Sequence, residues 1–284
     1  MSLSFSSRTA YLLVTHGSRD PRPAIAAQAL ARQVAVHLER SPVLQQDING
    51  GHFSTGFSSQ NKADTILVGT ACLELAPMPL HQQIVEFSDR ALQLGYSTLL
   101  IVPLFLLPGI HVREDIPQEV AIAQRILSQT ASHKMDLHIC PYLGSAPGIA
   151  ETIQNPKSKI QNSTTPLPPT ILLAHGSRRP GGNRPIEAIA TQLGAHPAYW
   201  SVSPGLETQI QQLSQQGHNH ITVIPYFLFA GGITDAIAQM VGEISDRYPH
   251  LTLILGQPLG ARDDIVRLII NLVEATQQNL VPSP

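Results

Sequence analysis

Two patterns of hydrophobic positions alternate along the chain. The first is a continuous apolar run, as in STLLIVPLFLL, which begins at Ser97, and HITVIPYFLF, which begins at His220. Runs of this kind are typical of strands that are buried on both faces of a parallel sheet. The predicted strands cover residues 11–16, 64–73, 97–106, 136–142, 170–174, 198–203, 220–229 and 251–257.

The second pattern places apolar residues about every 3.6 positions, as expected of helices that bury one face. In the first such segment Ile25 and Val36 belong to the periodic pattern, and Leu30, Val34 and Leu38 fill the predicted buried stripe. The predicted helices cover residues 24–39, 79–94, 116–130, 184–194, 205–216, 234–247 and 263–278.

Strands and helices alternate in the same order in both halves of the chain. The tetrapeptide His-Gly-Ser-Arg ends the first strand of each half, at His16 and at His175, and VPLFLLPGIH in the first half aligns with IPYFLFAGGI in the second. Such repetition indicates an internal duplication. The predicted fold class is α/β, with two similar doubly wound domains, each built on a parallel sheet.

Two segments interrupt these patterns. Residues 154–169 are rich in Pro, Asn, Ser and Thr and have little to bury, which is typical of a linker. We therefore predict an N-terminal domain over residues 1–153 and a C-terminal domain over residues 170–284. Residues 41–62 are too long for an ordinary connection, and we predict a surface loop there.

Composition narrows the classes of protein to consider. The 284 residues are 43% hydrophobic and 13% charged, with a formal net charge of -2, so we expect a globular protein that does not bind nucleic acid. The longest apolar run, residues 99–110, is too short to span a membrane, and no secretory signal is visible, so we expect a cytoplasmic location. The chain has 2 cysteines, Cys72 and Cys140, and we expect both to be reduced thiols.

Candidate chemistry gathers where the first three strands of the first half end. His16 closes one strand, Glu74 closes the next, and His111 follows the third. Ligands of open parallel sheets bind beyond the carboxyl ends of the strands, so the fold can bring these side chains to one rim. Taken singly, each is also compatible with a structural role. Together, imidazoles and a carboxylate suit a divalent first-row metal, and they can also accept protons.

Neighbouring residues have predicted local roles. Gly17 and Gly109 are expected to let the chain turn, because glycine tolerates backbone conformations that other residues avoid. Asp115 stands three positions before Gln118, a spacing that predicts a capping box at the start of the next helix.

The segments VTHGSRDPR, CLELAPMPL and VPLFLLPGIHVREDIP together resemble the class II chelatases of the CbiX/SirB type, in their long two-domain form. These lyases insert Fe²⁺ or Co²⁺ into sirohydrochlorin in siroheme and cobalamin biosynthesis. The resemblance covers nearly the whole chain, and its most specific part is Gly-x-His followed by Asp-Ile-Pro. It implies two chelatase-like (flavodoxin-like) domains, no organic cofactor, and a divalent metal as substrate, with Ni²⁺ a further candidate.

The resemblance also implies roles for individual residues. His16 and His111 would bind the metal and accept protons, and Glu74 would assist them as a third ligand. We expect residues of the same loops, and of their counterparts in the second half, to meet the carboxylates of the tetrapyrrole. These predicted substrate-binding residues are Ser18, Arg19, Arg22, Arg113, His175 and Arg178. The alternative role for His175 is to hold its own loop, and we slightly favour it.

The second half departs from this pattern. His175 keeps the strand-end position, but Ile233 aligns with His111, and the segment that aligns with Glu74 has no carboxylate. An isoleucine side chain can neither bind a metal nor accept a proton. We therefore predict one metal-inserting site, in the first half, and a degenerate second half, in a chain that we expect to be a monomer.

Other functions fit parts of the pattern. A tetrapyrrole or metal carrier would need the same ligands without accelerating insertion. A phosphoryl-transfer enzyme with a nucleophilic histidine would want an arginine directly before His-Gly, where Thr15 and Ala174 stand, so that hypothesis ranks last.

Overall fold

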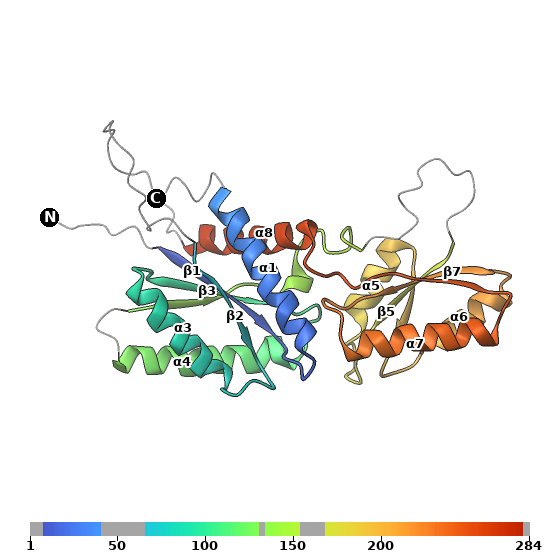
Figure 1. Ribbon diagram of the computed structural model, residues 1–284, viewed down its shortest axis with the longest axis horizontal. Helices are drawn as coiled ribbons and strands as arrows, with labels where there is room; N and C mark the ends of the chain where they lie inside the picture. Colours follow the sequence, from blue (N-terminus) through green and yellow to red (C-terminus); the bar gives the residue numbers. More distant parts are fainter. Residues whose placement is uncertain (1–7, 41–65, 131–133, 154–167, 281–284) are drawn as a thin grey trace. The chain divides into compact units, whose positions relative to one another are not determined.

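The computed structural model describes residues 8–40, 66–130, 134–153 and 168–280, and it divides the chain into two compact units. The predicted surface loop at 41–62 and most of the predicted linker lie outside these residues. Figure 1 shows the two units, each with its own sheet.

The sheet of the first unit has four parallel strands in the order β2-β1-β3-β4. The strands are short, and residues of β1 and β3 are almost completely buried. Their bounds are β1 Thr9–Thr15, β2 Val68–Cys72, β3 Thr98–Pro103 and β4 Asp136–Ile139.

Helices cover both faces of this sheet, as the buried apolar strands require (Figure 1). Helices α3 (Leu80–Gln93) and α4 (Ile116–Thr130) pack on one face. Helix α1 (Pro21–Arg40) packs on the other face through the predicted stripe, since Leu30, Val34 and Leu38 are buried. Ile25 and Val36 of the same periodic pattern are exposed.

The sheet of the second unit repeats this order, β6-β5-β7-β8, again with parallel strands only. This agreement confirms the predicted duplicated α/β fold. The strands are β5 Thr170–Ala174, β6 His196–Tyr199, β7 His220–Pro225 and β8 Thr252–Leu255; the helices are α5 Arg184–Leu193, α6 Leu206–Gln215 and α7 Gly232–Arg247.

The last helix, α8 (Asp263–Leu280), lies in the second half of the sequence, but most of it belongs to the first structural unit. Its residues from Val266 onward belong to the first unit, where Gln277 donates a hydrogen bond from Nε2 to the Tyr11 hydroxyl at 3.2 Å. Burial raises the pKa of this tyrosine above its ordinary value. Helix α8 thus completes the face of the first sheet on which α1 packs (Figure 1).

The unit boundaries therefore differ from the predicted domains. Residues Pro147–Ile153 and Asp20–Pro23 group with the second unit, and Val266 onward groups with the first. An amphipathic pattern reports that a helix has an apolar face, but not which sheet covers it. Among the described residues, both cysteines are free, and no helix is both long and apolar enough to cross a bilayer.

Candidate metal centre

Backbone pairing beyond the strand ends brings His16 and Glu74 together. The Leu73 N–H donates to the Thr15 carbonyl, and the Glu74 N–H donates to the His16 carbonyl, each at 2.9 Å. The parallel pairing of β1 with β2 thus continues up to the two functional residues. Because the backbones are bonded, both side chains emerge at the carboxyl edge of the sheet.

Gly17 makes this approach possible. Its φ of +100° lies where side chains are strongly disfavoured, and a Cβ there would stand 1.9 Å from the Glu74 carbonyl oxygen. The predicted role of Gly17 is therefore confirmed. Gly109 differs, because its φ is not left-handed and a Cβ there would meet no atom within 4 Å.

His111 comes from a one-turn π-helix, η1 (His111–Asp115), which leads directly into α4. Its Nδ1–H donates to the Asp115 carboxylate at 2.7 Å. The predicted capping box is wrong, because Asp115 does not begin a helix: helical backbone already starts at Ile110. The Asp115 carboxylate instead accepts the hydrogen bond from the imidazole. Single-turn π segments recur at functional sites.

The three predicted ligands converge in the structure. Each of His16, Glu74 and His111 offers a ligand atom that lies within 4.8 Å of the other two. The His16 Nε2 stands 4.0 Å from the nearer Glu74 oxygen, and the rings of His16 and His111 meet edge to face at 4.8 Å between centroids. No other such group of His, Cys, Asp and Glu occurs in the part of the chain that the structure describes.

The three side chains stand slightly too far apart to hold one ion without moving. An ion bound at about 2.1 Å in tetrahedral geometry would need ligand atoms roughly 3.4 Å apart, so the side chains must close by about 1 Å. His16 and Glu74 are half exposed, with side-chain exposures of 51% and 49%, and can make this movement. Three protein ligands leave one side of the ion open to a further ligand.

Phe105 packs beside both imidazoles. Its ring centroid lies 6.2 Å from that of His16 and 6.0 Å from that of His111. Phe105 also packs against the core of the first unit. The site is therefore backed by an apolar ring on one side, a feature that the sequence analysis missed although Phe105 lies at the end of a predicted strand.

The second unit repeats the backbone of this site without its chemistry. The Ser201 N–H donates to the His175 carbonyl at 2.9 Å, the same bond that links Glu74 to His16. Ser201 thus stands in the place of Glu74, and its hydroxyl also donates to the His175 carbonyl, at 2.9 Å. Ile233 lies in the first turn of α7 and is 38% exposed.

Five of the six predicted substrate-binding side chains are exposed and are not drawn into the ligand cluster: Ser18, Arg19, Arg113, His175 and Arg178. Their contact with a substrate stays a prediction.

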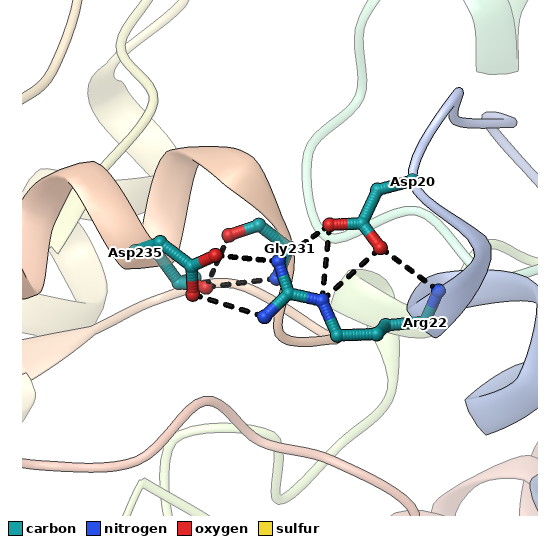
Figure 2. A network of polar contacts seen from close by, with 5 residues as sticks. Asp20, Arg22, Gly231 and Asp235 are labelled. Atoms are coloured by element: carbon teal, nitrogen blue, oxygen red, sulfur yellow. Dashed lines mark hydrogen bonds and ion pairs between the residues drawn. The ribbon is translucent and has the colours of Figure 1, made fainter.

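Arg22 is engaged by carboxylates instead (Figure 2). It lies in the short stretch that groups with the second unit, where its Nη1 donates to Asp235 at 3.1 Å and its Nε donates to Asp20 at 3.0 Å. These bonds hold the pKa of both carboxyls below the ordinary value and raise that of Arg22. A guanidinium held by two carboxylates has little capacity left for a third, so the structure does not favour Arg22 as a substrate ligand.

Comparison with known proteins gives a consistent result. The model of a protein family described as CbiX matches residues 57–158 and 169–276. The first match contains Glu74 and His111 but begins after His16, and the second contains His175.

Curated relatives and a solved structure agree with this match. A sirohydrochlorin ferrochelatase of Priestia megaterium is 24% identical over 214 residues, or 71% of this chain and 75% of the relative. A sirohydrochlorin cobaltochelatase of the same organism is 24% identical over 211 residues, or 69% and 65%. The structure of SirB from Bacillus subtilis with Fe³⁺ is similar at a TM-score of 0.69 and 19% identity and covers 95% of each chain. This last likeness shows a shared fold.

Proposed function

Because the chain belongs to the CbiX family, we propose that it is a sirohydrochlorin chelatase that inserts a divalent metal into the macrocycle with His16, Glu74 and His111. The observation that carries the proposal is the convergence of these three ligands within 4.8 Å at the carboxyl edge of one sheet. Relatives that are named for iron and for cobalt make Fe²⁺ and Co²⁺ the first metals to test. Imidazole also suits Ni²⁺, which we keep as a further candidate.

The chemistry of insertion needs what these residues offer. A metal-free tetrapyrrole carries pyrrole N–H protons that must leave before its nitrogens enclose the ion. Metal insertion therefore exchanges one divalent cation for two protons, and the protein must supply both a dock and proton acceptors. Imidazoles and a carboxylate can fill both roles, and the open side of a three-ligand site can face the macrocycle.

Residues of the loops that carry the ligands, and of their counterparts in the second half, suit an anionic substrate. Sirohydrochlorin carries several carboxylates, and arginine binds carboxylates with a bidentate geometry. We assign Ser18, Arg19 and Arg113 to contacts with these groups and keep His175 and Arg178 as further candidates; all five are exposed. Reaction products would serve siroheme or cobalamin synthesis.

An anaerobic insertion assay tests the proposal. The absorbance of sirohydrochlorin is followed with Fe²⁺, Co²⁺ or Ni²⁺, in the presence and absence of protein. We expect His16→Ala and His111→Ala each to abolish the acceleration, with thermal unfolding close to wild type because both side chains are at least partly exposed.

His220→Ala is the matched control. His220 is an exposed histidine at the amino end of β7, whereas the candidate ligands lie at the carboxyl ends of their strands. This variant should keep the wild-type rate. Full activity of both the His16 and His111 variants would refute the proposal. A protein that shifts the spectrum of sirohydrochlorin without accelerating insertion would be a carrier.

A further inference from the structure

Asp115 contacts Nδ1 of the His111 imidazole, which leaves Nε2 as the ring nitrogen that can bind a metal. The two residues are i and i+4 neighbours, joined by the 2.7 Å hydrogen bond from Nδ1 to the carboxylate. An ionised carboxylate only accepts hydrogen bonds, so the hydrogen lies on Nδ1 and the free lone pair lies on Nε2. The nitrogen that remains for a metal is therefore fixed by Asp115.

His111 is held more firmly than His16. Its side chain is 27% exposed, and it contacts the rings of both His16 and Phe105. His16 is 51% exposed, and its Nδ1 lies 3.4 Å from the Gly17 carbonyl oxygen. The stronger hydrogen bond and the tighter packing are thus concentrated on one of the two imidazoles.

The backbone supports this pairing. In the π-turn the Ile116 N–H donates to the His111 carbonyl, so the segment His111–Asp115 forms a single wide turn. Ile116, the next residue, is fully buried in the core of the first unit. The backbone of Asp115 is therefore held in place by its buried neighbour, so the carboxylate can restrain the orientation of the His111 ring.

We propose that Asp115 is a positioning residue that holds His111 in the tautomer and orientation in which Nε2 binds the metal. This proposal rests on the function proposed above in one respect: the ion that His111 binds is the ion that the enzyme inserts into the macrocycle. Carboxylates behind a metal-binding histidine fix its tautomer and ring orientation, and their loss typically weakens metal binding about 10- to 100-fold.

The first experiment measures binding of Co²⁺ alone to the full-length protein, by the visible absorbance of the bound ion. Asp115→Ala should raise the Kd for Co²⁺ by about 10- to 100-fold. Glu114→Ala is the matched control, because Glu114 is the exposed carboxylate next in sequence and its loss removes the same charge. This control should leave the Kd within about threefold of wild type, since exposed charges are screened by solvent.

The second experiment observes the ring nitrogens of ¹⁵N-labelled histidine by NMR in the metal-free protein, with His111→Ala used to assign the signals of His111. Wild type should show His111 protonated at Nδ1 and free at Nε2. Asp115→Ala should shift His111 toward protonation at Nε2, a change that a merely structural role would not produce.

The outcomes are separable. An unchanged Kd and an unchanged tautomer in Asp115→Ala would overturn the positioning role, as would an equal loss of affinity in Glu114→Ala. If wild type shows the expected tautomer but binds no Co²⁺, then the proposed metal chemistry fails and the role of Asp115 fails with it. Reduced Co²⁺ binding in Asp115→Ala but no insertion by wild type would leave the positioning role intact and refute the proposed enzyme.

Discussion

Gly17→Ala is the most severe test of how the candidate site is built. Gly17 has a φ of +100°, and an added Cβ would lie 1.9 Å from the oxygen and 2.8 Å from the carbon of the Glu74 carbonyl. Carbon and oxygen atoms in contact lie about 3.5 Å apart, so one backbone segment must move by roughly 1.6 Å. No side-chain rotation can relieve this overlap, because the position of an alanine Cβ is fixed by the backbone.

The magnitude follows from these contacts. A non-glycine residue in such a region costs about 1–3 kcal/mol, and separating the Glu74 N–H from the His16 carbonyl costs about 1 kcal/mol more. We therefore expect Gly17→Ala to lower the free energy of unfolding by about 2–4 kcal/mol. The site should suffer further, since a misplacement of about 1 Å can reduce a catalytic rate on the order of 100-fold.

Gly109→Ala is the matched control. It stands close to His111 in sequence, yet its Cβ would meet nothing within 4 Å and its φ is not left-handed. Urea unfolding, Co²⁺ binding and the insertion rate are measured for both variants. If Gly17→Ala gives the same results as Gly109→Ala in all of these measurements, then the site does not depend on the close approach of Gly17 to the Glu74 carbonyl.

Other predictions concern stability. Leu75 has a φ of 58°, is 58% exposed, and is the one described non-glycine residue with positive φ. Leu75→Gly should relieve about 1 kcal/mol of backbone strain and so raise the Tm, which thermal unfolding measures; an unchanged or lower Tm would contradict this. Ile269→Ala, in the buried face of α8, should cost about 2–5 kcal/mol and speed hydrogen exchange in β1 and β3 more than in β5 and β7; equal effects would contradict the assignment of α8. Arg22 lowers the pKa of Asp235. The contribution of this ion pair to the free energy of unfolding is therefore fully present above the ordinary aspartate pKa, and it is lost as the pH falls through the lowered pKa. Asp235→Asn should therefore flatten the acid limb of a stability–pH profile, and an unchanged profile would show that the exposed pair contributes nothing.

Much of the architecture could be predicted from local pattern. Strands buried on both faces require continuous apolar residues, and amphipathic helices require a 3.6-residue repeat. The type and order of the strands and helices could therefore be predicted from the sequence. The parallel sheet then placed His16 and Glu74 at one edge, because all carboxyl ends of its strands lie there. The absence of a second site could likewise be predicted, from Ile233 opposite His111 and from the missing carboxylate opposite Glu74.

Local pattern reveals neither a residue's distant partners nor which of two meanings a spacing has. Asp115 fits a capping box by spacing, but the same residue lies four positions after His111, and in a helical turn that spacing makes it the partner of the imidazole. Arg22 was expected at a substrate, yet Asp235, 213 positions away, accepts its hydrogen bonds.

The sequence by itself determined the repeated order of elements and the types of ligand at each strand end, because both depend on residues that are neighbours in the chain. Only the tertiary structure decided that α8 covers the first sheet, that Gly17 must lack a side chain because the Glu74 carbonyl occupies its place, and that His111 is oriented by Asp115. These features depend on atoms brought together by packing and by backbone conformation, and hydrophobic periodicity carries no information about either.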